Sequence, residues 1–260
     1  MNLLAIETAT DLVGAAVHAG DGGVVERSHV GGRAHAELLA PVIEEVCAMA
    51  GCTLGDLDGL AVDVGPGLFT GLRVGVATAK ALGQALGLDV VGVTSLDVLA
   101  AAARELAGTD RAARVVTVVD ARRGEVFAAA YDFTGGGVDA DVDPASVRDD
   151  RAEALAPGDL AGWLDDLATS GRVLVVGDGA VRYLELLAPR PGMDLGLAET
   201  IAAPAPAVLA RLAVRRLAAG TLPTPPGDVV PDYRRHADAK INWEERAPRR
   251  TAPAAPAGTS

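Results

Sequence analysis

Apolar residues along this chain follow two spacings, and the switches between them divide it into expected strands and helices. Short apolar runs at residues 3–6, 13–17 and 23–30 predict three strands joined by polar turns. Residues 35–49 then keep apolar side chains at helical spacing, although Pro41 is expected to kink or restart that helix. Residues 90–93 predict a short buried strand, after which Ser95 is expected to cap a helix over 96–106. This order of elements indicates an α/β fold.

The stretch from Val62 to Arg73 predicts a strand, a tight loop and the start of a long helix. A β-branched run ends in Gly65-Pro66-Gly67, and a proline-free, apolar-periodic segment follows it. Glycine at these positions permits backbone angles that a side chain would forbid. We expect Thr70 to be the N-cap of the helix, whose first free amides form a weak anion site.

Small residues recur every four positions along that helix and therefore share one of its faces. Each glycine inside a helix costs about 1 kcal/mol relative to alanine, so close packing must compensate. A partner helix or the chain's own sheet would explain the stripe equally well. Together with the apolar face of residues 38–49, this stripe indicates a flat surface that a partner protein contacts. The predicted interface comprises Leu38, Leu39, Val42, Val46, Gly71, Gly75, Ala79 and Gly83.

An internal repeat is the most informative feature of the pattern. Residues 116–130 follow the plan of residues 3–17, in which a buried strand ends in an acid and a second strand returns after a polar turn. The two acids are Glu7 and Asp120. Residues 173–187 likewise echo the strand, loop and helix of residues 60–83. The repeat predicts two lobes of related topology.

The lobe boundaries follow from breaks in the pattern. We assign residues 1–107 with 200–222 to the first lobe and residues 108–199 to a smaller second lobe. A helix over 204–219 is expected to pack back on the first lobe, and residues 134–159, rich in Gly, Asp and Pro, to form a mobile connection. We expect residues 223–246 to be extended because of their prolines. We expect residues 247–260 to be a disordered tail, because they hold too little hydrophobic bulk to fold.

Composition narrows the classes of function. Half of the residues are hydrophobic, 31 are glycine and only 3% are aromatic, as in closely packed α/β proteins. The net charge of −12 argues against this chain making the main contact to a nucleic acid. Without a long uncharged apolar stretch or a signal peptide, a cytoplasmic location is expected. Cys47 and Cys52 are then expected to be packing residues rather than a disulfide or a metal site.

Several polar residues could carry chemistry at a cleft between the lobes. Glu7 and Asp120 could bind Mg²⁺ or act as acid and base, although capping of turns is the favoured interpretation. His35 is expected to be a cap or a surface residue, and Arg73 to meet an anionic group, a partner acid or Asp63. The candidate nucleotide or anion contacts are Glu7, Thr8, Gly65, Gly67, Thr70, Asp120, Gly177 and Gly179.

Familiar catalytic patterns are missing from the sequence. The four histidines include no pair at helical i, i+4 spacing, the spacing that lets two histidines on one helix bind the same metal ion. Neither a Gly-x-Ser-x-Gly elbow nor a P-loop occurs. We therefore expect no catalytic residue and no metal site.

Each of the two lobes opens on a hairpin whose first strand ends in an acid. This arrangement resembles the sugar kinase, Hsp70 and actin (ASKHA) superfamily, which implies a ribonuclease H-like fold. Five motifs in order make the chain similar to the TsaB (YeaZ) family, over residues 2–236. They are Ala5-Ile6-Glu7-Thr8, His35 to Ile43, Gly65 to Gly75, Asp120 to Val126, and Pro231-Asp232-Tyr233-Arg234-Arg235. Five motifs in sequence order seldom arise by chance.

This resemblance implies a non-catalytic subunit of the machinery that forms N6-threonylcarbamoyladenosine in tRNAs reading codons that begin with A. It implies pairing with the catalytic homologue TsaD through the first two helices, with the ATPase TsaE and the tRNA reached only through the complex. We expect a homodimer when the chain is alone, no tightly bound cofactor, and ATP or ADP only at the partner interface. The alternatives are an autonomous ATP-dependent kinase or ATPase, or a peptidase-like protein.

Overall fold

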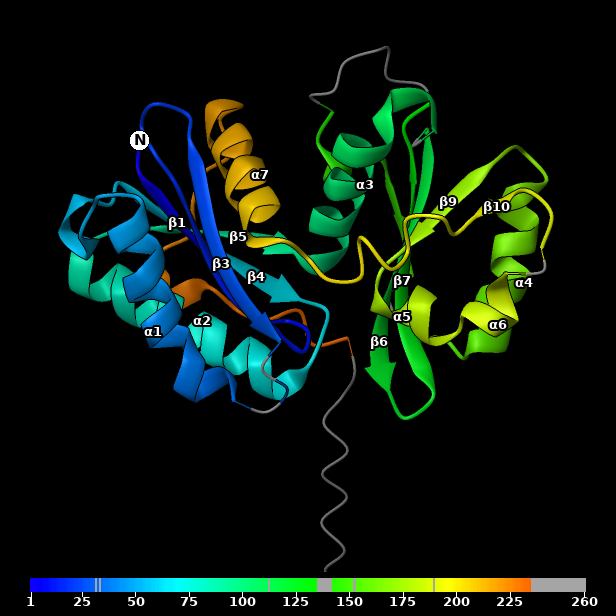
Figure 1. Cartoon of the computed structure of the whole chain (residues 1–260), viewed down its shortest axis with the longest axis horizontal. Coiled ribbons are helices and arrows are strands. Elements are labelled where there is room, and N and C mark those ends of the chain that lie inside the picture. Colours follow the sequence, from blue (N-terminus) through cyan, green and yellow to red (C-terminus); the bar gives the residue numbers. More distant parts are fainter. Residues whose placement is uncertain are drawn as a thin grey trace, which may run out of the picture.

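Two five-stranded sheets frame the protein, and helices cover both faces of each (Figure 1). The computed structural model describes residues 1–234 apart from 31, 33, 112, 135–141, 152 and 189. The first sheet has the order β3-β2-β1-β4-β5. Its strands are β1 (Leu3–Glu7), β2 (Leu12–His18), β3 (Val24–Val30), β4 (Gly59–Gly65) and β5 (Val90–Thr94).

The second sheet repeats this topology, with the order β8-β7-β6-β9-β10. In both sheets the first two pairs along this order are antiparallel and the last two are parallel. The strands are β6 (Arg114–Arg122), β7 (Glu125–Asp132), β8 (Arg148–Asp150), β9 (Val173–Val176) and β10 (Met193–Asp194). The predicted repeat and the two-lobed α/β fold are thereby confirmed.

The helices form three layers that alternate with the two sheets. The layer outside the first sheet holds α1 (His35–Met49) and α2 (Phe69–Leu86). The middle layer, between the sheets, holds α3 (Ser95–Arg111) and α7 (Pro206–Ala218). The layer outside the second sheet holds α4 (Pro157–Ala168), α5 (Asp178–Arg182) and α6 (Leu184–Leu187). Short 3₁₀ turns lie at Leu54–Asp56, Pro144–Val147 and Pro226–Asp228.

Because both faces of each sheet are covered, the inner strands β1, β4 and β9 are largely apolar and buried, whereas the edge strands β3 and β8 carry polar residues. Successive side chains of β1 alternate between two cores: Leu4 and Ile6 face α1 and α2, whereas Leu3 and Ala5 face α7 and α3. α7 packs on β1 and β2, as expected of a last helix that returns to the first lobe. α3 contributes to the cores of both sheets, so the lobes share this helix.

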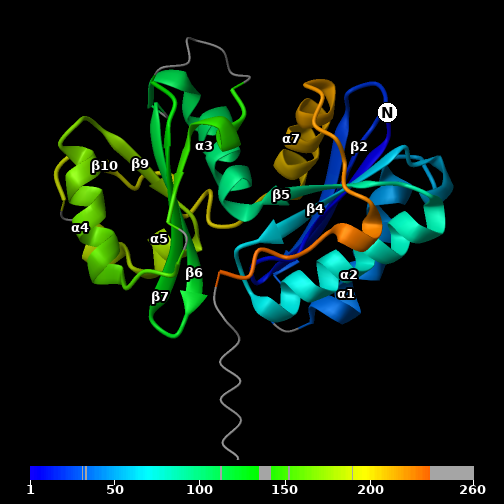
Figure 2. The same cartoon turned by 180° about the vertical axis from the view of Figure 1, so that it is seen from behind.

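After α7, the chain forms a strap, residues 221–234, that crosses the outer side of the first lobe (Figure 2). Thr224 pairs with Val90 at the sheet edge through two backbone hydrogen bonds of 2.8 and 2.9 Å. The strap then passes over α2, where the Lys80 ammonium donates to the carbonyls of Gly227 and Val229. It ends beside β4, where the Asp232 amide donates to the Val64 carbonyl at 2.7 Å.

Several local expectations were wrong. Helix α2 begins at Phe69, so Thr70 is an exposed residue of its first turn rather than the N-cap. The Ser95 hydroxyl donates to Asp63, and the Thr94 hydroxyl instead accepts from the Asp97 amide at the start of α3. Helix α1 runs through Pro41.

The connection expected over residues 134–159 holds a strand and the start of a helix, β8 and α4, although residues 135–141 lie outside the described part. The helical segment expected to run through Leu187 is broken at Tyr183 into α5 and α6. The predicted tail over residues 247–260 lies outside the described residues.

Candidate functional site

Two buried acids lie where neighbouring parallel strands of the first sheet end. Glu7 ends β1 and Asp63 lies in β4, and both side chains are fully buried. Glu7 Oε1 accepts from the Ala9 amide at 2.7 Å, while Asp63 Oδ1 accepts from the Gly65 amide and the Ser95 hydroxyl, each at 2.7 Å. Burial raises the pKa of Glu7 well above its usual value, and the Asp63 charge raises it further.

Asp63 is the second member of this pair. Burial also raises the pKa of Asp63, but hydrogen bonds from Glu7, Ser95 and Gly65 oppose that rise. Asp63 is fully buried, and its expected partner Arg73 lies over the Phe69 ring instead. Asp63 was missed as a site residue, although it stands two positions before the Gly-Pro-Gly loop.

The Gly65-Pro66-Gly67 loop packs directly on the turn between β1 and β2. A Cβ on Gly67 would lie 2.1 Å from the Ala9 carbonyl oxygen, which also accepts from the Leu68 amide at 2.7 Å. The Gly65–Pro66 peptide bond is cis, and Gly65 has a φ of 102°, which favours glycine. The chain's own hairpin turn therefore occupies the space beside Gly67, whereas Leu72 and the Asp232 carbonyl lie beside Gly65.

The beginning of α2 packs on the same turn. A Cβ on Gly71 would lie 2.1 Å from the Thr8 carbonyl oxygen, and the buried Thr8 hydroxyl donates to the Gly71 carbonyl at 2.8 Å. His35 was expected to be a cap or a surface residue, but it is buried and its Nε2 donates to the Thr10 carbonyl at 2.8 Å. The first turns of α1 and α2 are thus both tied to the hairpin turn.

In the second lobe, the acid at the position that corresponds to Glu7 pairs with arginines. Asp120 is buried and pairs with the guanidinium groups of Arg122 and Arg182, each at 3.1 Å. Its amide donates to Asp178 Oδ1 at 2.8 Å, and burial raises the pKa of Asp178 to about 6. Arg122 also reaches across to the first lobe and pairs with Asp11 at 2.7 Å.

The glycines of the second loop are likewise close to the chain's own backbone. A Cβ on Gly177 would lie 2.1 Å from the Val118 carbonyl oxygen, and one on Gly179 would lie 2.7 Å from Val118 Cγ1. The predicted nucleotide contacts thus form two groups, one in each lobe, which the Arg122–Asp11 pair connects. Thr8, Gly67, Gly177 and Gly179 are each explained by packing within the chain.

The predicted partner interface requires correction. Its members are buried against other segments of this chain, except Leu38, which is half-buried. The four residues of α1 belong to the first core or pack against it. In α2, a Cβ on Gly75 would lie 2.3 Å from Thr8 Oγ1, and one on Gly83 would lie 2.7 Å from Pro226 Cγ. Contacts within the fold therefore explain the stripe of Gly71, Gly75, Ala79 and Gly83, because the hairpin turn and the strap lie against it.

The opposite faces of these two helices are exposed and also carry small side chains. On α1 these are Ala40 and Ala48, interspersed with exposed glutamates, and on α2 they are Ala77 and Ala81. We call these four alanines and the exposed residues between them the outer face. The buried residues of the same helices pack in the first core, so the outer face is turned away from the first sheet.

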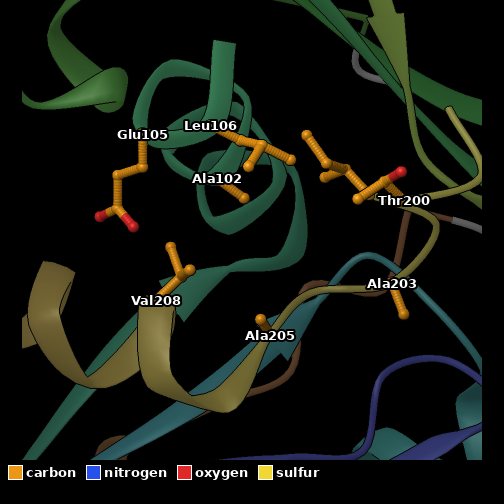
Figure 3. Close-up of a pocket in the computed structure, with 8 residues that line it drawn as sticks. Ala102, Glu105, Leu106, Thr200, Ala203, Ala205 and Val208 are labelled. Atoms are coloured by element: carbon orange, nitrogen blue, oxygen red, sulfur yellow. The ribbon is translucent and has the colours of Figure 1, made fainter. Parts of the chain in front are cut away.

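A pocket of about 280 Å³ lies between α3, α7 and the segment before α7 (Figure 3). Apolar side chains dominate its wall, which includes Leu106, Ile201 and Val208. Glu105 at its rim pairs with Arg211 at 2.5 Å. Nothing in the sequence pattern predicted this pocket, because its walls come from three segments that only the fold brings together.

No group of three or more His, Cys, Asp or Glu side chains among the described residues is arranged to hold a metal ion. None of the helices in the same part of the chain combines the length and the apolar character needed to cross a membrane.

A family model described as TsaD, tRNA N6-adenosine threonylcarbamoyltransferase, matches residues 8–243. The chain belongs to this family. Within it, the chain is similar to TsaB (YeaZ) proteins. It is 29% identical to the tRNA threonylcarbamoyladenosine biosynthesis protein TsaB of Bacillus subtilis over 248 residues, which cover 94% of this chain and 99% of that protein.

A second relative matches part of the chain more closely. An uncharacterized protein of Mycobacterium tuberculosis is 45% identical over 131 residues, which cover 50% of this chain and 58% of that protein. Among solved structures, a Pseudomonas aeruginosa protein with similarity to peptidase YeaZ matches with a TM-score of 0.72 and 28% identity. That match covers 90% of this chain and 99% of the other. The similarity therefore includes the whole two-lobed fold.

Proposed function

We propose that this chain is a non-catalytic, activating subunit in the formation of N6-threonylcarbamoyladenosine in tRNAs that read codons beginning with A. It acts by pairing with the catalytic homologue TsaD. One observation carries the non-catalytic assignment: a glycine of each loop that was predicted to contact a nucleotide lies against the chain's own backbone. Gly67 abuts the Ala9 carbonyl, and Gly177 abuts the Val118 carbonyl.

The partner surface in this proposal is the outer face of α1 and α2. Its small side chains allow another helix to approach closely, and it lies outside the cores that fix both helices. The same face pairs two copies of this chain when the partner is absent. Because the net charge is −12, the tRNA contacts this chain only through the complex. The ATPase TsaE joins that complex, and ATP or ADP binds at the partner interface.

Size exclusion with light scattering tests this proposal, with the chain alone and mixed with TsaD from the same organism. A stable mixed species is expected to replace any homodimer. Ala81→Arg places a long charged side chain on the outer face and should weaken the mixed species by roughly tenfold or more, about 1.4 kcal/mol. Ala218→Arg is the matched control, because Ala218 is an exposed alanine at the end of α7, on the other side of the sheet.

Both variants should keep the melting temperature of the wild-type chain, since both positions are exposed. Absence of a complex at micromolar concentration would refute the pairing. Equal loss of binding in both variants would refute the location of the interface. Steady-state ATP turnover by the chain alone would refute the non-catalytic assignment and support an autonomous ATPase.

A further inference from the structure

Two aromatic rings and an arginine form an exposed cluster at the beginning of α2. Phe69 and Tyr233 are 42% and 43% exposed, and their ring centroids lie 5.1 Å apart. The Arg73 guanidinium carbon lies 3.9 Å from the centroid of the Phe69 ring. Its Nε donates to Tyr233 Oη at 3.3 Å. In a chain that is only 3% aromatic, this is an unusual concentration of exposed rings.

The strap holds this cluster in place. The residues on both sides of Tyr233 are anchored: the Asp232 amide donates to the Val64 carbonyl, and the Arg234 side chain is only 6% exposed. Arg234 pairs with Asp232 at 2.8 Å, and its Nη2 donates to Asp150 of the second lobe at 2.7 Å. Tyr233 is therefore presented by a fixed backbone, and little ordering entropy remains to be lost when a ligand binds it.

The charge of Arg73 is not neutralised within the described part of the chain. No carboxylate there pairs with it, whereas Arg122 and Arg234 each pair with aspartates. An uncompensated cation on a protein of net charge −12 is a local site of opposite sign. Arginine and tyrosine beside another aromatic ring are the residues that dominate binding energy in protein interfaces.

We propose that this cluster anchors the partner interface by seating an aspartate or glutamate side chain of the partner subunit. The partner carboxylate pairs with the Arg73 guanidinium, and an apolar neighbour packs on the Phe69 and Tyr233 rings. Arg73 and Ala77 are four residues apart in α2, so the cluster continues the outer face described above. This inference rests on the proposed function and adds the chemistry of the partner.

The test compares Arg73→Gln with Arg172→Gln in titrations of the full-length chain with its TsaD partner. Arg172 is the control because it is an exposed arginine of the second lobe, with 65% of its side chain accessible. We expect Arg73→Gln to weaken the complex by about 30-fold and Arg172→Gln to leave it unchanged. Tyr233→Leu should also weaken it. The affinity of the wild-type complex should fall more steeply with salt than that of the Arg73→Gln complex.

Charge reversal gives a sharper result. Arg73→Glu should abolish binding of the partner. Among Asp→Lys and Glu→Lys variants of the partner, one should restore binding to the Arg73→Glu chain. If the wild-type chain forms no complex, the proposed function itself fails. If the wild-type chain binds and Arg73→Glu binds equally well, only this inference fails. An intact protein complex with weakened tRNA binding would place the cluster against nucleic acid and overturn the inference.

Discussion

Gly71→Ala tests whether the small-residue stripe of α2 is fixed by this chain's own fold. The added Cβ would lie 2.1 Å from the Thr8 carbonyl oxygen, whereas ordinary contacts begin at 3.4 Å. Helix and hairpin turn must therefore separate by about 1 Å. This separation strains the hydrogen bond from the Thr8 hydroxyl to the Gly71 carbonyl, which is 2.8 Å long and buried.

The expected loss of stability follows from three contributions. Overpacking of a tight contact costs about 1–3 kcal/mol, and weakening one buried hydrogen bond costs about 1 kcal/mol. Higher helix propensity returns up to about 1 kcal/mol. The net destabilisation is about 1–4 kcal/mol, which lowers the melting temperature of a protein of this size by roughly 2–16 °C.

Gly162→Ala is the matched control, because it adds the same methyl group inside a helix but into open space. Gly162 lies in α4, and nothing lies within 4 Å of the position of its Cβ. The helix-propensity gain alone should then raise the melting temperature by about 2–4 °C. Calorimetric melts of the two variants in one buffer should move in opposite directions. If Gly71→Ala melts at or above the wild-type temperature, the hairpin turn does not confine the stripe, and its assignment to a partner surface returns.

Two further predictions concern buried charges. Because the pKa of Glu7 is raised in the folded state, its stabilising contribution is complete below the unfolded value of 4.5 and is lost as pH rises through the folded pKa. Between about pH 5 and 8, the melting temperature of Glu7→Gln should therefore fall less than that of the wild type. Equal falls in the two proteins would contradict a raised pKa of Glu7. Asp97 is buried and accepts from Arg216 at 2.8 Å and from Arg148 at 3.0 Å. Asp97→Asn should cost about 3–5 kcal/mol in chemical denaturation. Glu105→Gln, at an exposed ion pair, should cost less than about 1 kcal/mol, and equal losses in the two variants would show that burial does not set the cost.

Local patterns were sufficient to predict most of the elements. The helix over residues 35–49 has the predicted bounds, because its apolar period is unbroken. The repeated hairpin predicted the shared topology of the sheets, since each lobe must bury both faces of the same strand arrangement. The pattern failed at β8 and α4, where Gly, Asp and Pro indicate loops, and where pairing with β7 and burial of Leu160 and Leu164 override that tendency.

The segments that pack against a given helix face or buried side chain could not be predicted from the sequence. A stripe of small residues shows that something approaches α2 closely, but it does not say what. The groups that approach are Thr8, 63 residues earlier than its hydrogen-bond partner Gly71, and the strap at Pro226, which lies over Gly83. Two partners of Asp97 come from α7 and from β8. Local periodicity contains no information on such distant contacts.

The two acids at the repeated hairpin position show how this fold differs from one that binds a cation in its cleft. A carboxylate that holds a cation must keep its charge and face solvent or the ligand. Burial beside Asp63 raises the pKa of Glu7 and so disfavours its charge, and the charge of Asp120 is compensated by Arg122 and Arg182. Arg122 then links Asp120 to Asp11 of the other lobe. The equivalent acids of the two lobes therefore stabilise the turns and the connection between the lobes. This use of the two acids supports the proposal that the chain acts through the outer face of α1 and α2.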